Sequence, residues 1–359
     1  MASTSPSAAA GRAATARRTC ASADKPPGAL RRGAARALSR LVDPTVVFSF
    51  DHIGYRVHAL GFDPTALDVD LRDRVCLVTG ANSGLGLATA RGLAQRGARL
   101  WMLCRSEARG AAARARLIAE TGHDDIHLAI VDVADNRSID AFMADFPEVE
   151  VDVLVHNAGV LPDARDLDDR GVERTVRTHV AGPQRLTTRL LSRLHAAHSA
   201  RDGRTSRVIW VSSGGMYTNR LDLDGPPWRP RGAYSGLRAY AQTKRAQVIL
   251  ARQWGARLAG TGVRVHSMHP GWADTAAVQQ ALPGFARVIG GRLRTVDEGA
   301  DTILYLAIAR AVADAPPGRF WFDRAIRSAH ALPGTRASDR ERRRLWRLAQ
   351  DLAGLDEPG

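Results

Sequence analysis

The chain has 359 residues, a formal net charge of +14 and only three cysteines. Its positive charge lies mostly at the ends: residues 1–42 contain eight Lys or Arg and one acid, and residues 324–347 contain eight Arg and two acids. A nucleic-acid-binding body would carry clustered charge on its folded surface, so this distribution argues against nucleic acid as a partner. Three cysteines give no disulfide framework, and no Cys/His cluster has zinc-ligand spacing, so we expect no metal site.

Residues 1–42 are rich in Ala, Arg, Ser, Pro and Gly and almost free of acids and large apolar side chains. This composition predicts a disordered basic tail. It is also typical of an organelle transit peptide, and translation from a mis-assigned start codon would give the same composition. No apolar run approaches the ~18 residues that span a membrane. We therefore expect a soluble, cytoplasmic protein, or an organellar one if the tail is a transit peptide.

Two further segments flank the main domain. Residues 43–70 mix apolar side chains with His and Arg, and we expect a helix packed on the body, with a membrane-surface or partner-binding role as the alternative. Residues 324–359 form a basic extension, in which apolar side chains at helical spacing predict an amphipathic helix over 335–353: Leu345, Trp346, Leu348 and Leu352. That helix would cover the body, a second subunit of a homo-oligomer or an anionic membrane surface.

Residues 71–323 are interpreted as one domain that begins with a buried strand and a glycine-rich turn. An apolar run at 75–78 ends at Gly80, and Gly84 and Gly86 then open an amphipathic helix. Glycines so placed allow a tight turn, a close approach of backbone to a pyrophosphate, and close helix–strand packing. Because a strand precedes the turn and a helix follows it, the sequence predicts a dinucleotide site here.

Strands and helices alternate after this turn, which predicts an α/β, doubly wound Rossmann fold: a seven-stranded parallel sheet with helices on both faces. We expect strands near 75–78, 99–104, 126–131, 151–155, 206–212, 263–268 and 318–322. We expect helices at 106–120, 136–145, 170–196, 238–260 and 296–309. Ligands of such sheets bind beyond the carboxyl ends of the strands.

Lys244 stands out because lysine occurs only at positions 25 and 244, whereas the other basic residues are all Arg. It follows Tyr240 by four residues on the expected helix, so the two side chains lie on one face. An ammonium group beside a phenol favours the phenolate and lowers the pKa of the phenol. The planar, bulkier guanidinium is not an equivalent substitute. The pair therefore predicts a tyrosine that exchanges protons near neutral pH.

Several ordered motifs carry a family resemblance. Over residues 70–323 the chain resembles the short-chain dehydrogenase/reductase superfamily, in the order Thr79-Gly80-x-x-x-Gly84-x-Gly86, Asn157-Ala158-Gly159, Ser213, Tyr240-x-x-x-Lys244 and Pro270-Gly271. Val-Ser-Ser-Gly-Gly-Met at 211–216 and Ser-Met-His-Pro-Gly-Trp-Ala-Asp-Thr at 267–275 are similar to the branch that contains dehydrogenase/reductase SDR family member twelve, near the retinol dehydrogenases. The resemblance implies a Rossmann fold and a nicotinamide-dependent oxidoreductase.

The resemblance also implies a cofactor site along the strand ends: Gly80, Asn82, Ser83, Gly84, Leu85, Gly86, Arg105, Asp132, Val133, Asn157, Ala158, Gly159, Tyr240, Lys244, Pro270, Gly271 and Thr275. Asp132 is expected at the adenine. At the end of the second strand an acid would bind the ribose hydroxyls of NAD, whereas an Arg suits the 2′-phosphate of NADP. The chain offers Arg105 there and no acid before Glu107, so we expect NADP(H). The alternative is that Arg105 is an ordinary surface arginine.

The catalytic roles are likewise implied by the resemblance. Tyr240 would act as the acid/base, Lys244 would lower its pKa and hold the ribose, and Ser213 rather than Ser212 would bind the substrate oxygen. Thr178 occupies the position at which the family normally has an asparagine that holds a relay water. A hydroxyl still binds water but lacks the two-sided geometry of an amide. This departure keeps open a second interpretation, a catalytically weak NADP(H)-binding sensor or scaffold.

The substrate implied by the resemblance is a small apolar alcohol or carbonyl compound that is retinoid-, steroid- or lipid-like. Candidates for its pocket are aromatic and aliphatic side chains after Ser213 and Pro270: Met216, Tyr217, Trp228, Tyr234, Trp272, Leu282 and Phe285. Such side chains line many ligand pockets, but the same residue types equally serve core or loop packing.

Overall fold

A mostly parallel sheet forms the centre of the protein in the computed structural model, which describes residues 28–43, 45–200, 204–225, 227–229, 232–275, 290–330 and 334–355. Its strands are β1 (Val75–Thr79), β2 (Arg99–Cys104), β3 (Ile126–Ile130), β4 (Val153–His156), β5 (Ser206–Val211), β6 (Val263–Met268), β7 (Phe320–Phe322) and β8 (Ala325–Ile326). Every residue of β1, β4 and β5 is buried, as expected for parallel strands covered on both faces.

The strand order is β3-β2-β1-β4-β5-β6-β7-β8. The first seven strands pair in parallel, and β8 adds an antiparallel edge to β7. Strands β2 and β3 follow β1 toward one edge of the sheet, whereas β4 to β7 follow one another toward the opposite edge. The order therefore reverses at the β1/β4 boundary, which is the switch point of a doubly wound sheet. The predicted Rossmann fold is confirmed, with β8 as an addition to the seven expected strands.

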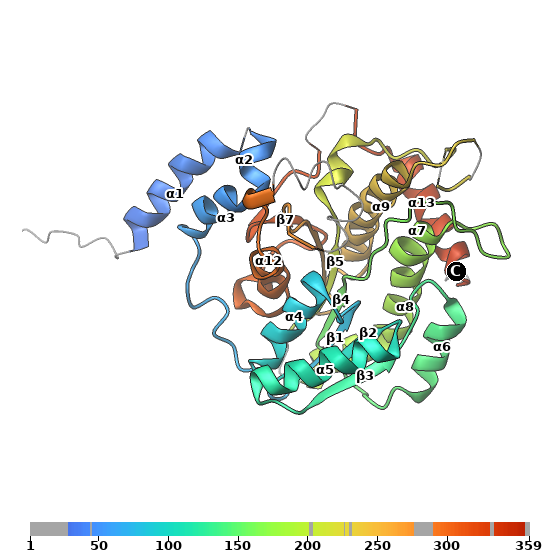
Figure 1. The fold of residues 1–359 in the computed structure, drawn as a ribbon, viewed down its shortest axis with the longest axis horizontal. Helices are drawn as coiled ribbons and strands as arrows, with labels where there is room; N and C mark the ends of the chain where they lie inside the picture. Colours follow the sequence, from blue (N-terminus) through green and yellow to red (C-terminus); the bar gives the residue numbers. More distant parts are fainter. Residues whose placement is uncertain are drawn as a thin grey trace, which may run out of the picture.

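Helices cover both faces of the sheet (Figure 1). One layer consists of α4 (Gly84–Ala94), α5 (Glu107–Thr121) and α12 (Val296–Ile308). The other consists of α6 (Asn136–Asp145), α8 (Gly182–Ala200) and α9 (Gly236–Arg257). Each layer has its own apolar core, centred on residues such as Leu93 and Ile303 on one face and Leu190 and Ile249 on the other.

The helix expected at 170–196 is broken at its start. A short helix α7 (Arg174–Val176) leads into a π-helical turn, η1 (Arg177–Ala181), before α8 begins. Gly182 explains why the chain can pass there, because a Cβ at this residue would lie 1.9 Å from the Val133 carbonyl oxygen. Single π-helical turns inside α-helices often occur at functional sites.

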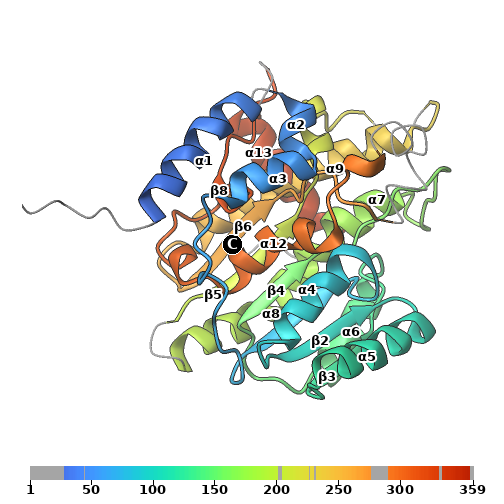
Figure 2. The ribbon, with the colours of Figure 1, turned by 60° about the vertical axis from the view of Figure 1, so that its left-hand side comes forward.

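The described part of the segment before β1 contains three helices, α1 (Gly28–Val42), α2 (Val46–Phe50) and α3 (His52–Ala59). They lie side by side at the β7–β8 end of the sheet (Figure 2). Asp51 caps α3, since its carboxylate accepts hydrogen bonds from the backbone N–H groups of Ile53 and Gly54. Helix α1 falls within the segment for which composition predicts a tail, whose first 27 residues lie outside the described part of the chain.

The C-terminal helix α13 (Asp339–Leu352) covers the protein's own body. Leu345 is fully buried, and the Trp346 ring packs against Trp254 of α9 with ring centroids 5.1 Å apart. The Arg257 guanidinium lies 3.8 Å from the centre of the Trp346 ring. Across the described helices, no stretch has the length and apolar character that crossing a lipid bilayer requires.

Candidate active site

The glycine-rich turn after β1 adopts backbone conformations that side chains disfavour. Gly80 and Gly84 have φ angles of +66° and +53°, in the left-handed region that favours glycine. A Cβ at Gly86 would lie 2.3 Å from the Gly80 carbonyl oxygen and 2.4 Å from Asn157 Nδ2. The start of α4 can therefore lie against β1 and β4 only with glycine at residue 86, and its N-terminus faces the end of β1, where a phosphate would bind.

Thr79 joins the glycine turn to the Asn157-Ala158 segment. Its hydroxyl accepts hydrogen bonds from the N–H groups of Asn157 and Ala158, both at 3.0 Å, and donates to the Val155 carbonyl. The Asn157 amide donates in turn to the Thr79 carbonyl at 3.0 Å. Thr79 is not among the site residues predicted from the sequence, although its position directly before Gly80 in the glycine-rich motif could have indicated it.

A cavity of about 840 Å³ lies beyond the carboxyl ends of the strands. Apart from Gly86, which packs beneath it, every residue predicted for cofactor binding or catalysis lines this cavity, including Asn82, Ser83, Leu85, Gly159 and Thr275. The residues converge from five strand ends, from the loop after β6, from the π-helical turn η1 and from helix α9. The cavity is therefore large enough for a dinucleotide, and it lies at the topological switch point, where such ligands bind.

Two arginines occupy the end of the cavity next to β2. Arg105 follows β2, and Arg109 lies one turn later on α5; both are exposed and both line the cavity. No carboxylate in the described ranges forms an ion pair with Arg105. Asp132 is already occupied, because its carboxylate accepts hydrogen bonds from the Ala134 N–H and from Arg174. Arg109 was not predicted, although its spacing of four residues from Arg105 on an expected helix indicates a shared face.

Helix α9 places Tyr240 and Lys244 one turn apart at the other end of the cavity. The ammonium nitrogen Nζ of Lys244 lies 5.4 Å from the centre of the Tyr240 ring and donates a 2.8 Å hydrogen bond to the Val211 carbonyl. Ser213 follows β5 and hydrogen-bonds to Tyr240. The neighbouring Ser212 points elsewhere, since its hydroxyl donates to the Lys244 carbonyl at 2.8 Å.

Burial dominates the electrostatics of this pair. It raises the pKa of Tyr240, and the hydrogen bond from Ser213 opposes the rise. Burial also lowers the pKa of Lys244 to about 7. The sequence predicted a Tyr240 pKa lowered by Lys244, but in the structure burial of the phenol raises this pKa. Lys244 does not offset this rise, because burial also disfavours its charged form and its amine is hydrogen-bonded to the Val211 carbonyl.

His179 is a buried residue of the site that sequence reasoning missed. It lies in the π-helical turn next to Thr178, and its ring centroid is 5.5 Å from that of Tyr240. Its Nε2 accepts the Val160 N–H at 3.0 Å, so the ring proton is assigned to Nδ1, which lies 2.8 Å from the Thr243 hydroxyl. Burial and then Lys244 hold the pKa of His179 well below its usual value. Thr178, which occupies the position of the family's relay asparagine, lines the cavity.

Most of the side chains considered for a substrate pocket pack elsewhere. Met216 is fully buried, the Tyr217 hydroxyl donates to the Ser328 carbonyl, and the Tyr234 hydroxyl donates to Glu173. Neither these three nor Trp228, which packs against the core, lines the cavity, whereas Trp272 does. Leu282 and Phe285 lie outside the described residues. The apolar wall near Tyr240 is instead aliphatic, from Val160, Leu161 and Leu237.

Comparisons with known proteins agree with this geometry. The short chain dehydrogenase family model matches residues 74–220. Dehydrogenase/reductase SDR family member 12 of Bos taurus is 38% identical over 302 residues, which cover 84% of this chain and 92% of that protein. Retinol dehydrogenase 12 of Bos taurus is 31% identical over 297 residues, covering 80% and 89%.

Among solved structures, an uncharacterized protein from Mycobacterium Paratuberculosis is 30% identical with a TM-score of 0.61, covering 82% of this chain and 98% of that one. The match of sequence extends over most of both chains, and the strand order, the glycine turn and the cavity are those of a nicotinamide-dinucleotide fold. The chain therefore belongs to the short-chain dehydrogenase/reductase family of oxidoreductases, which includes retinol dehydrogenases.

Proposed function

We propose that the protein is an NADP(H)-dependent oxidoreductase that interconverts an apolar alcohol and its carbonyl compound, with Tyr240 as the acid/base. The observation that carries the proposal is the convergence of Ser213, Tyr240 and Lys244 at one end of a cavity whose other end holds Arg105 and Arg109. The dinucleotide would supply or accept the hydride at the carbonyl carbon. The protein must then deliver or accept one proton at the carbonyl oxygen.

The residues of this chain are arranged to move that proton. In the reducing direction, Ser213 would bind the carbonyl oxygen, and the Tyr240 hydroxyl would give it a proton as the oxygen gains charge. The resulting phenolate would be favoured by the hydrogen bond from Ser213, and by Lys244 when its amine is protonated. In the oxidising direction the same groups would act in reverse. The aliphatic side chains near Tyr240 support an apolar substrate, because they line the cavity where the reacting carbon would lie.

The choice of NADP(H) is supported by the two exposed arginines at the β2 end. A 2′-phosphate would gain charge-assisted hydrogen bonds from Arg105 and Arg109, whereas the ribose hydroxyls of NAD would find no acid at the end of β2. The residues proposed to bind the dinucleotide are those that the resemblance implies for the cofactor; all of them line the cavity except Gly86, which packs beneath it.

One observation favours a second candidate function, that of a dinucleotide-binding protein with weak catalysis. Burial raises the pKa of Tyr240 and lowers that of Lys244, so it favours the neutral form of both groups. A protein of this kind would bind NADPH tightly and turn over no member of a carbonyl panel.

Tyr240→Phe tests the proposal. It removes the exchangeable proton and keeps the ring that packs against His179. We expect NADPH affinity within about twofold of wild type and a loss of kcat on the order of 10²–10⁴, the usual contribution of general acid/base catalysis. NADPH absorbance during incubation with a panel of aldehydes, ketones and alcohols measures both directions. Full activity in Tyr240→Phe would exclude Tyr240 as the acid/base.

A further inference from the structure

The loop after β6, residues 270–275, forms one wall of the cavity and is held from behind by two other segments. The Trp272 N–H donates to the Phe50 carbonyl of α2 at 2.8 Å. On the other side, the Arg294 N–H donates to the Trp272 carbonyl and the Asp274 N–H donates to the Arg294 carbonyl, both at 2.8 Å. The loop is thus paired through its backbone with residues that lie far away in sequence.

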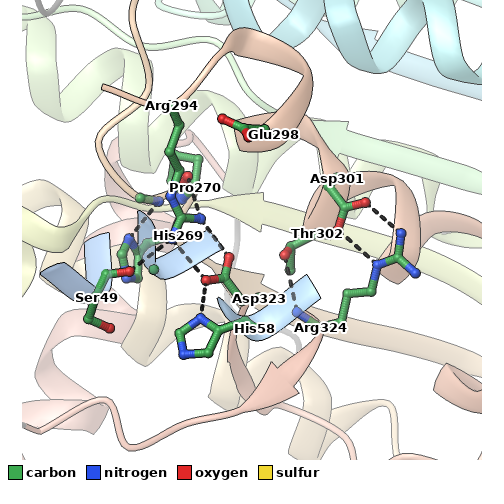
Figure 3. Close-up of polar contacts among 12 residues, drawn as sticks. Ser49, His58, His269, Pro270, Arg294, Glu298, Asp301, Thr302, Asp323 and Arg324 are labelled. Atoms are coloured by element: carbon green, nitrogen blue, oxygen red, sulfur yellow. Dashed lines mark hydrogen bonds and ion pairs between the residues drawn. The ribbon is translucent and has the colours of Figure 1, made fainter. Parts of the chain in front are cut away.

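The side chain of Arg294 joins these segments. It is only 1% exposed, and its guanidinium forms a two-pronged ion pair with Asp323, at 2.6 and 2.9 Å (Figure 3). The same guanidinium donates to the carbonyls of Ser49 and Asp51, at 2.9 and 3.1 Å. One buried cation therefore connects the α2–α3 turn to the β7–β8 turn directly behind the loop.

Asp323 completes a fully paired buried network. It adopts a left-handed conformation, with φ of 48°, which places its carboxylate between Arg294 and His58. His58 Nδ1 lies 2.6 Å from that carboxylate, and His58 Nε2 lies 2.9 Å from Asp43. Burial alone would raise the pKa of Asp323, but Arg294 and His58 outweigh it and lower the pKa. Removing both members of a buried ion pair is often tolerated, whereas removing one partner is strongly destabilising because it leaves the other charge buried and unpaired.

Close packing ties this network to the reacting end of the cavity. Gly271 has φ of +75°, and a Cβ there would lie 2.4 Å from Arg294 Nε, so the guanidinium packs directly beneath the loop backbone. The Phe50 ring packs edge-on against His269, with centroids 4.5 Å apart, and lies 3.1 Å from the ideal Cβ position of Gly214. Gly214 follows Ser213, so Phe50 of the α2–α3 segment contacts both the 270–275 loop and the turn that carries Ser213.

We propose that Arg294 is a positioning residue that, together with Phe50 and the α2–α3 segment, fixes the 270–275 wall against Ser213 and Tyr240. The α2–α3 segment then supports the active site from behind the 270–275 loop, although it precedes the Rossmann domain in the sequence. The catalytic consequence rests on the proposed function, whereas the restraint on the loop does not.

The test uses the full chain with paired substitutions. Arg294→Met together with Asp323→Asn removes the ion pair without leaving a buried charge alone, and Asn tolerates the left-handed conformation. Phe50→Ala removes the packing and leaves the ion pair intact, so it serves if the double variant fails to fold. The matched control is Arg324→Met with Asp301→Asn. That neighbouring pair is also two-pronged and largely buried, at 11% and 9% side-chain exposure, and the other hydrogen bonds of Arg324 go to Thr302 and Asp63.

The first readout is hydrogen exchange in the cofactor-free protein, which does not depend on any activity. Exchange at the amides of 272 and 274 should rise about tenfold or more in the double variant and in Phe50→Ala, with α9 unchanged. The control should leave the loop amides at wild-type rates. Unchanged exchange at these amides in both test variants would overturn the proposed restraint, whatever cofactor the protein binds.

The second readout separates the two ends of the cavity. NADPH should bind about tenfold or more weakly to the test variants and kcat/KM should fall on the order of 100-fold, since small misplacement of a reacting wall has effects of this size. Affinity for 2′,5′-ADP, which lacks the nicotinamide half, should stay within about twofold. An equal loss for both nucleotides would overturn the positioning role in favour of general destabilisation. Failure of wild type to bind NADPH would refute the proposed cofactor and leaves the exchange result to decide the inference.

Discussion

Replacing Lys244 by Met should make the ligand-free protein more stable while removing its activity. Lys244 is buried, and burial lowers its pKa from 10.5 to about 7. Because one pKa unit corresponds to ~1.36 kcal/mol, keeping this side chain protonated in the folded state costs roughly 5 kcal/mol. Met is similar in length and has no charge to desolvate. The Val211 carbonyl would lose its hydrogen bond, at a cost of about 1 kcal/mol.

The pH dependence follows from the protons that each state binds. Between pH 7 and 10.5 the unfolded chain holds a proton on Lys244 that the folded chain has released, so stability rises with pH across this window. Below pH 7 both states are protonated, and the penalty is complete. Above pH 10.5 both are neutral, and it is absent. The Met variant should therefore be more stable by about 4 kcal/mol at pH 6, a gain that falls to about zero near pH 10 and becomes a deficit of about 1 kcal/mol above pH 10.5.

Urea unfolding at pH 6, 8 and 10 measures this difference in the free energy of unfolding. Arg238→Met is the matched control, because Arg238 lies on the same helix, carries the same formal charge and has a side chain that is 55% exposed. The control should show no stabilisation at any pH. A wild-type protein as stable as Lys244→Met at pH 6, or a gain that does not vary with pH, would refute the argument that burial of the charged lysine costs stability.

Two further substitutions test the ends of the site and of the chain. Arg105→Asp should weaken NADPH binding by about tenfold or more and NADH binding little, because a charge-assisted contact becomes a repulsion; titration with both nucleotides checks this, and equal effects would identify an ordinary surface arginine. Trp346→Ala should lower the free energy of unfolding by about 3–5 kcal/mol, whereas Val149→Ala, at a side chain 77% exposed, should not; similar losses in both would contradict the packing of α13.

The strands and the site motifs were predictable because each depends on local sequence. Apolar runs identify strands that are buried on both faces, and glycines mark the turn where backbone must approach a ligand. The strand end of β2 fixes Arg105 by position alone. The predicted residues converge on one cavity because the carboxyl ends of parallel strands meet at one edge of the sheet.

The remaining features depend on contacts between distant segments, which local patterns do not encode. Arg294 looks like one more arginine in an arginine-rich sequence, and only the fold brings Asp323 and Ser49 to it. His179 could be recognised only once the π-helical turn directed it toward Thr243. The raised pKa of Tyr240 depends on how deeply the helix α9 is buried, and the spacing of Tyr240 and Lys244 carries no information about that.

The two-residue strand β8 determines which edge of the sheet is open to other chains. It pairs with β7 through Trp321 and Phe322, and it is too short to serve as a template for a further strand. The chain turns into it through Asp323 and Arg324, both left-handed, so the same turn that carries the buried ion pair also ends the sheet. At the opposite end β3 presents five residues. Edge-to-edge aggregation of partly unfolded molecules should therefore begin at β3 and not at the end next to the active-site wall.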